Sequence, residues 1–148
     1  MQLREHLIGY AFKHNIYDLN FIDTSKITDM SNLFANCEYD IDVSNWDVSN
    51  VTNMYNMFYC CKNFDCDLSN WNVSNVIDMY SMFIVCENFK GKGLENWDVS
   101  NVKDIGSMFG GCENFNCNLS SWDVSNVTDM GMMENFMDLE CTQKALKV

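Results

Sequence analysis

The sequence contains no proline among its 148 residues, and basic side chains are scarce. Proline removes a hydrogen bond from a ladder of paired chains, so its absence is compatible with a chain of hydrogen-bonded units. Lysine and arginine number 9 against 21 acids, which gives a net charge of −12. This charge opposes binding to phosphate backbones and anionic lipid surfaces. Nucleic acid is therefore not an expected partner.

Long hydrophobic runs are also missing. No apolar stretch approaches the roughly 18 residues that a membrane span needs. The N-terminal segment carries Arg4, Glu5 and Lys13 and has no small-residue cleavage site, so it does not have the pattern of a secretory signal. We therefore expect no membrane insertion, and a cytoplasmic or assembly-associated location in preference to the cell surface.

What the sequence does contain is a repeat. One tryptophan recurs at intervals of 25, 26 and 25 residues, as Trp46, Trp71, Trp97 and Trp122. A fixed period of this size is typical of a solenoid, in which neighbouring units stack and bury a shared core. We expect a single solenoid domain over residues 1–148, in which tryptophan stacks on tryptophan and cysteine on cysteine.

Each unit predicts one short strand and one short helix. Leu68, Trp71 and Val73 have the LxxLxL spacing, whose last apolar positions alternate with polar ones as in a strand with one buried face. The apolar residues that follow, from Val76 to Cys86, are spaced 3, 3, 1 and 3, which fits one face of a helix. Asn75 and Asp78 resemble a helix start. The predicted fold class is therefore α/β, a solenoid of about 25-residue strand-plus-short-helix units.

The ends of the chain depart from the pattern. Residues 1–18 place Leu3, Leu7, Ile8 and Ala11 at helical spacing, so they predict a helical N-terminal cap over the repeats of residues 19–137. In the last unit Glu134 replaces a phenylalanine and Met137 replaces the repeat cysteine. Residues 138–148 are therefore expected to form a C-terminal cap or tail, because a solenoid needs its ends covered.

The cysteines follow the repeat rather than one another. Cys37, Cys61, Cys86 and Cys112 recur at spacings of 24, 25 and 26, and we interpret them as buried thiols that act as small hydrophobes rather than as disulfides. The pairs Cys61–Cys66 and Cys112–Cys117 suggest a zinc site. Two stacked units separate the pairs by about 10 Å, however, and thiolates on one zinc ion lie within about 4 Å of each other. No metal site is expected.

Polar residues define the surface that the repeats expose. The alternation with tryptophan and valine predicts rows of outward side chains, and we treat the face as either a binding surface or a polar face that keeps the protein soluble. The candidate binding residues are Asp47, Asn72, Asp98 and Asp123 in the central row and Asn45, Asn70 and Asn96 beside it. A further row, Asn50, Asn75, Asn101 and Asn126, is predicted to satisfy backbone groups, with a ligand role as the alternative.

The core of the unit, "NWDVSNV" followed by "M..MF..C", resembles the BspA-like leucine-rich-repeat family. The closest resemblance is to the DUF285-type repeats of mycoplasma surface lipoproteins, which also occur in large DNA viruses and some protists. The resemblance covers about residues 19–137. It implies a right-handed leucine-rich-repeat-like solenoid used for adhesion or protein binding, without catalytic residues.

No catalytic constellation stands apart from the repeat. His6 and His14 have no HExxH spacing, and the chain shows no Ser-His-Asp order, phosphate loop or isolated carboxylate pair. We therefore expect a protein that is not an enzyme, has no cofactor and acts as an interaction or structural scaffold inside a cell or in an assembly such as a virus particle. An extracellular adhesion module is the alternative. The expected partner is a protein, and a basic protein is one candidate. End-to-end association of copies of this chain is left open.

Overall fold

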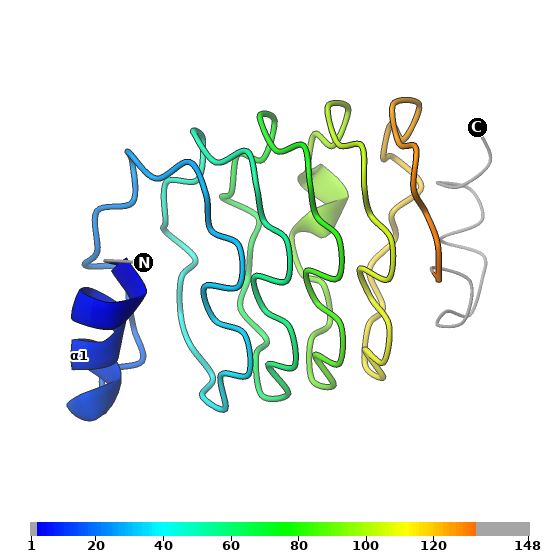
Figure 1. The fold of residues 1–148 in the computed structure, drawn as a ribbon. Helices are drawn as coiled ribbons and strands as arrows, with labels where there is room; N and C mark the ends of the chain where they lie inside the picture. The colour runs from blue at the N-terminus through cyan, green and yellow to red at the C-terminus, as the bar shows by residue number, and fades with distance from the viewer. Residues whose placement is uncertain (1–2, 133–148) are drawn as a thin grey trace.

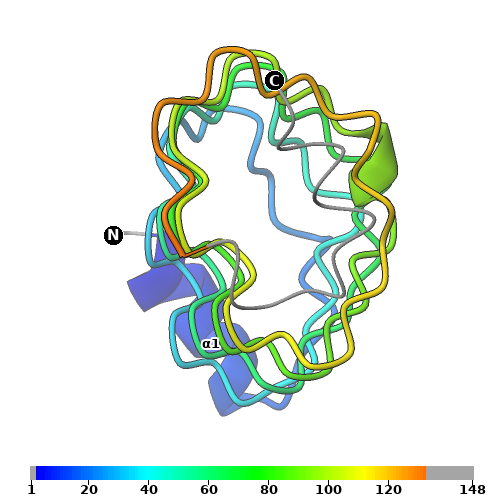
Figure 2. The same ribbon diagram turned by 90° about the vertical axis from the view of Figure 1, so that its right-hand side faces the viewer.

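The chain winds into a row of similar coils that lie side by side, with a helical segment at the N-terminal end (Figure 1). This computed structural model describes residues 3–132, so the features predicted for Glu134, Met137 and residues 138–148 lie outside the described residues. Seen along the row, the coils superimpose on a common closed outline (Figure 2). Residues one repeat apart therefore occupy equivalent positions on neighbouring coils.

The prediction of a strand-plus-helix unit is wrong. The described residues contain only the π-helix η1 (Leu3–Ile8), the helix α1 (Gly9–Lys13) and the 3-10 helix η2 (Leu94–Asn96). None of the three is the helix predicted after each tryptophan. Between coils there are isolated parallel bridges in place of strands, which link Asp29 to Asn53, Asn53 to Asp78, Asp78 to Asp104 and Asp104 to Asp129, with a further bridge from Asp18 to Asp42.

Consecutive turns occupy the place of the predicted helix. Met57 N–H donates to Met54 O at 3.1 Å, and Asn56 between them has φ of 54°, which is the mark of a type II turn. The backbone N–H groups of every second residue point out of their own coil and donate to carbonyl oxygens of the next one. These bonds run from Met54 to Asp78 O, Asn56 to Tyr80 O, Phe58 to Met82 O and Cys60 to Ile84 O, at 2.8–3.0 Å. A helix would need those N–H groups for its own carbonyls.

In the segment of the predicted strand, few backbone bonds join the coils, such as Leu68 N–H to Lys92 O, and side-chain donors make further bonds between coils. The indole N–H of each repeat tryptophan donates to a backbone carbonyl of the preceding coil. These bonds run from Trp46 to Leu19 O, Trp71 to Val43 O, Trp97 to Leu68 O and Trp122 to Leu94 O, at 2.7–3.1 Å. The segment is extended and alternates buried with exposed residues, but it has no strand ladder.

The predicted buried residues do form the core, and its stacking is confirmed. Trp71 and Trp97 stack with ring centroids 6.3 Å apart, and Trp97 and Trp122 with centroids 6.4 Å apart. Phe58 and Phe83 stack in a parallel file at 5.5 Å. The inward apolar residues of the turn segment from Val76 to Cys86 are fully buried, namely Val76, Met79, Met82, Phe83 and Cys86. The core is therefore a set of side-chain files that run along the row of coils.

The N-terminal helices lie against the first coil (Figure 1). Ile8 and Ala11 are buried there, as their helical spacing predicted, whereas Leu7 is 46% exposed and does not belong to the buried face. Phe12 of α1 forms an aromatic cluster with Tyr17 and Tyr39, with ring-centroid distances of 4.6–6.3 Å. None of the described helices is long and apolar enough to cross a membrane.

Candidate interaction surface

The central row of predicted binding residues is exposed and repeats from coil to coil. We call Asp47, Asn72, Asp98 and Asp123 the Asp column. Each side chain caps a turn, because its Oδ1 atom accepts both the backbone N–H and the hydroxyl of the serine two residues later. For Asp98 and Ser100 these distances are 3.0 and 2.6 Å. The pairs of Asp47 and Asn72 match them within 0.1 Å, and for Asp123 the N–H of Ser125 donates at 3.0 Å, with a further bond from the Ser125 hydroxyl. The repeated Asx-x-Ser sequence therefore holds each acceptor in one orientation.

These hydrogen bonds also fix the charge of the column. The hydroxyl and the amide of the serine hold the pKa of Asp47, Asp98 and Asp123 below the usual value of 3.8, because both donors favour the ionised carboxylate. Asp23, one coil earlier, has the same arrangement with Ser25 and the same direction of pKa shift. The column is therefore negatively charged throughout the neutral pH range.

The second predicted row, Asn45, Asn70 and Asn96, is also exposed. Its residues directly precede the buried tryptophans, and Asn96 ends η2. The backbone N–H of Asn45 donates to the side chain of Asn20 at 2.8 Å. The structure thus places all seven predicted residues on the surface in two rows. The side chains of these rows do not converge on a single point.

The row of Asn50, Asn75, Asn101 and Asn126, called the Asn ladder below, satisfies the backbone, as predicted. Each Nδ2 donates to a serine carbonyl of the preceding coil. The acceptors are Ser25, Ser49, Ser74 and Ser100, at 2.6–2.7 Å. The helix-start role suggested for Asn75 and Asp78 is wrong, since Asp78 instead accepts the N–H of Tyr80 at 2.8 Å within a turn.

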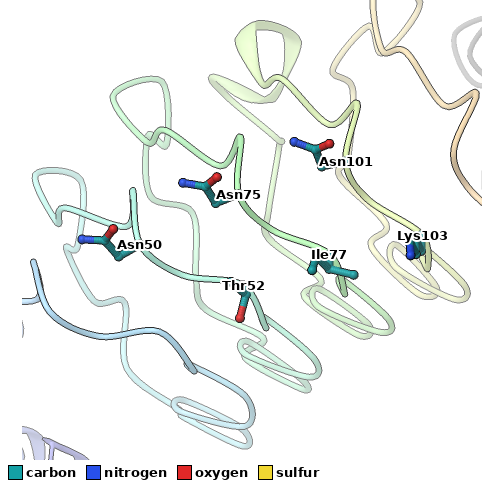
Figure 3. Close-up of a pocket in the computed structure, with 6 residues that line it drawn as sticks. All are labelled: Asn50, Thr52, Asn75, Ile77, Asn101 and Lys103. Atoms are coloured by element: carbon teal, nitrogen blue, oxygen red, sulfur yellow. The ribbon is translucent and has the colours of Figure 1, made fainter.

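A groove of about 500 Å³ lies along the Asn ladder, and the sequence reasoning missed it. Figure 3 shows Asn50, Asn75 and Asn101 in one row and a second row two residues further along each coil. The second row consists of Thr52, Ile77 and Lys103. A signal for the groove was present, because Ile77 is an apolar residue at an outward position and is 45% exposed.

The hydrogen-bonding chemistry of this surface is one-sided. Each Nδ2 of the Asn ladder uses one of its two N–H donors within the fold, and no described residue donates to the Oδ1 atoms of the ladder. The three aspartates of the column can only accept. Asn72 differs from them, because its Oδ1 is used by Ser74 and its amide donor remains at the surface. Apart from these remaining amide N–H groups and Lys103, the surface presents acceptors and negative charge, so acceptors predominate.

The thiols and acids of the described residues form no metal site. No group of three or more histidine, cysteine, aspartate or glutamate side chains lies close enough to hold an ion within residues 3–132. No described cysteine forms a disulfide; Cys61, Cys86 and Cys112 are buried and Cys60 is half-buried.

Comparison with known proteins identifies one family. The model of a family described as "Mycoplasma protein of unknown function, DUF285" matches residues 5–93 and 78–141. Searches of curated proteins and of solved structures found no match.

Proposed function

Because the chain belongs to the DUF285 family, whose function is unknown, we propose from its surface chemistry that it is a non-catalytic interaction scaffold. The proposed surface consists of the Asp column and the groove along the Asn ladder, and the proposed partner is a basic, donor-rich protein segment. The observation that supports this proposal is the one-sided hydrogen bonding of the surface. Guanidinium and ammonium groups supply only donors and positive charge, so they complement it.

The same surface predicts how binding works. Its acceptors repeat at coil spacing, and it has few of the aromatic anchors that dominate tight interfaces. Each coil therefore contributes little, and useful affinity requires several coils acting together. Binding should weaken as salt rises, because exposed charges are screened.

The finer resemblance to BspA-like repeats supports a protein-binding role and is itself part of the proposal. Members of that group act in adhesion, which is the second candidate function and would use the same surface outside the cell. We retain the intracellular or assembly-associated scaffold as the first candidate because the described cysteines form no disulfide, which is the usual state of cysteines in a reducing compartment. Mass spectrometry of the native protein separates the two, since glycans or disulfides favour the adhesion role.

The test uses a labelled peptide of alternating arginine and glycine, with a citrulline-for-arginine peptide as the uncharged control. The variant D47N/D98N/D123N removes three charges but keeps every Oδ1 acceptor for its serine. Binding of the arginine peptide should fall roughly tenfold or more at low salt, since exposed ion pairs are each worth up to about fivefold. The loss should shrink at high salt.

The matched control removes three charges elsewhere. Asp40, Asp65 and Glu113 lie between the repeat cysteine and the next tryptophan, away from the Asp column, and D40N/D65N/E113Q should leave binding close to wild type. N72D gives the opposite test, because it completes the negative column and should strengthen binding. Equal losses of binding in both triple variants would show that net charge alone explains the effect. This surface would then be rejected as the binding site.

A further inference from the structure

A second hollow lies at the N-terminal corner of the molecule, away from the Asp column. Its smaller part, about 280 Å³, lies between Phe12 of α1 and residues 33–39 of the first coil. Its larger part, about 700 Å³, extends over later coils and is lined by Cys60, Lys62 and Glu87, among others. The two parts share Asn36, Glu38 and Tyr39, so they adjoin. We call them together the corner groove.

The charges in the corner groove are unequally matched. The residue after each repeat cysteine is Glu38, Lys62, Glu87 or Glu113 on successive coils. Lys62 pairs with Glu87 at 3.0 Å, and the hydrogen bond to Glu87 raises the pKa of Lys62. No described residue pairs with the carboxylate of Glu38. Lys62, the basic residue of this row, is thus paired with Glu87, and Glu38, which lines both parts of the groove, has no described cation beside it.

The surroundings of Glu38 are suited to the rest of a cationic side chain. Tyr39 is 40% exposed, and its ring packs on Phe12 and Tyr17 with centroids 4.9 and 4.6 Å away. That packing holds the ring in place and leaves no space between the rings for a ligand. Glu38 and Tyr39 line the same hollow, so the stem of an arginine or lysine can pack on the exposed ring while the carboxylate neutralises its head.

We propose that the corner groove binds an arginine or lysine side chain of a partner peptide, together with a neighbouring apolar residue of that peptide. The carboxylate of Glu38 accepts from the cationic head. The stem lies along Tyr39, and the apolar neighbour enters the hollow between Phe12 and Leu33. This site is separate from the Asp column, so it adds a second point of attachment with its own anchor.

The experiment uses acetyl-Leu-Arg-amide, because it carries both expected features and is small enough to report on one site. Binding is followed by chemical-shift changes in the amide spectrum of the full chain, which also reports whether the fold is intact. The expected result is a saturable change confined to residues near Phe12 and 36–39. Acetyl-Leu-citrulline-amide, which has nearly the same shape and no charge, should bind far more weakly.

Two variants decide the assignment. E38Q keeps the shape of the side chain and should weaken binding of the arginine probe roughly fivefold, whereas the matched E113Q, in the same row but outside the groove, should not. D47N/D98N/D123N should also leave this probe unaffected. The proposal is overturned by no shift change at saturating probe, by shifts centred on the Asp column, or by equal effects of E38Q and E113Q. Failure here does not affect the arginine–glycine peptide test of the proposed function.

Discussion

The thiol of Cys86 donates to the carbonyl oxygen of Phe58 at 3.0 Å, in the preceding coil. Cys61 and Cys112 make the same bond to Phe34 and Phe83, at 3.0 and 2.9 Å. These cysteines therefore fill the core as small hydrophobes, as the sequence predicts, and also join neighbouring coils. The second role explains why a hydrogen-bond donor recurs at this position where alanine would also fit a small space.

The thiols should differ in reactivity. Cys61, Cys86 and Cys112 are at most 3% exposed, whereas Cys60 is half-buried. A thiol reagent should therefore modify Cys60 in the folded protein and the other three only after unfolding, because the thiolate is the reactive form and burial disfavours it. Peptide mapping after timed labelling measures this. Similar rates at all four positions would show that the core is open.

The buried thiols also predict a loss of stability in base. Burial raises the pKa of Cys112 to about 12 from the ordinary value of 9.0. The folded state then holds a proton that the unfolded state releases, so this contribution is intact below pH 9.0 and is lost as the pH rises toward 12. Urea unfolding at several pH values should show a shallower decline for Cys112→Ala than for the wild type. Parallel declines would contradict the assignment.

Trp71 should be among the most costly residues to truncate. Its ring is 4% exposed, stacks on Trp97 and donates to Val43 O. Trp71→Ala should lower the free energy of unfolding by about 3 to 5 kcal/mol. Asp98→Asn, which keeps the acceptor for Ser100, should change it by less than about 0.5 kcal/mol. Denaturant unfolding of both variants is the measurement, and equal losses would reject the inward and outward assignments.

The Asn ladder should tolerate a carboxylate poorly. In Asn75→Asp the donor to Ser49 O is replaced by a negative oxygen that faces this carbonyl. We expect a loss of about 1 to 2 kcal/mol in the free energy of unfolding. Asn70→Asp makes the same change of charge in the same coil, where the structure shows no ladder bond, and should cost less than about 0.5 kcal/mol. If both variants unfold alike, the ladder contributes little.

Gly93 should not accept a side chain. Its φ is 98°, and a β-carbon there would overlap the backbone nitrogen of Ser69 in the preceding coil. Gly93→Ala should therefore destabilise the protein by at least about 2 kcal/mol. Gly110→Ala is the control, because its β-carbon would lie 3.3 Å from the flexible Ile84 side chain and 3.6 Å from Ser107 O, without an overlap. Thermal unfolding compares the two, and a mild effect at Gly93 would mean that the coil can shift.

Much of the core could be predicted from the sequence because spacing alone identifies inward residues. Trp71, Met79, Phe83 and Cys86 are buried whether the backbone between them is a helix or a series of turns. The secondary structure could not be predicted in the same way, since spacings of 3, 3, 1 and 3 suit both. The distinguishing cue lay at the outward positions, where Asn32, Asn36 and Asn56 have positive φ, a conformation that asparagine tolerates well.

The surface was predicted only in part. The Asx-x-Ser sequence marks the exposed rows, and the structure places Asp47 and Asp98 there. The groove beside Ile77 and the corner groove near Tyr39 depend on which coils and helices adjoin. That information is carried by contacts between distant residues, such as Phe12 with Tyr39, and no local pattern encodes it.

The bonds between coils give each coil two different faces. The side-chain donors of Trp71, Asn75 and Cys86 all reach toward the preceding coil, whereas the backbone N–H of Met54 reaches toward the following one. A junction between copies that continued this bonding could therefore form only head to tail, and a head-to-tail junction without rotational closure produces an open filament rather than a symmetric pair.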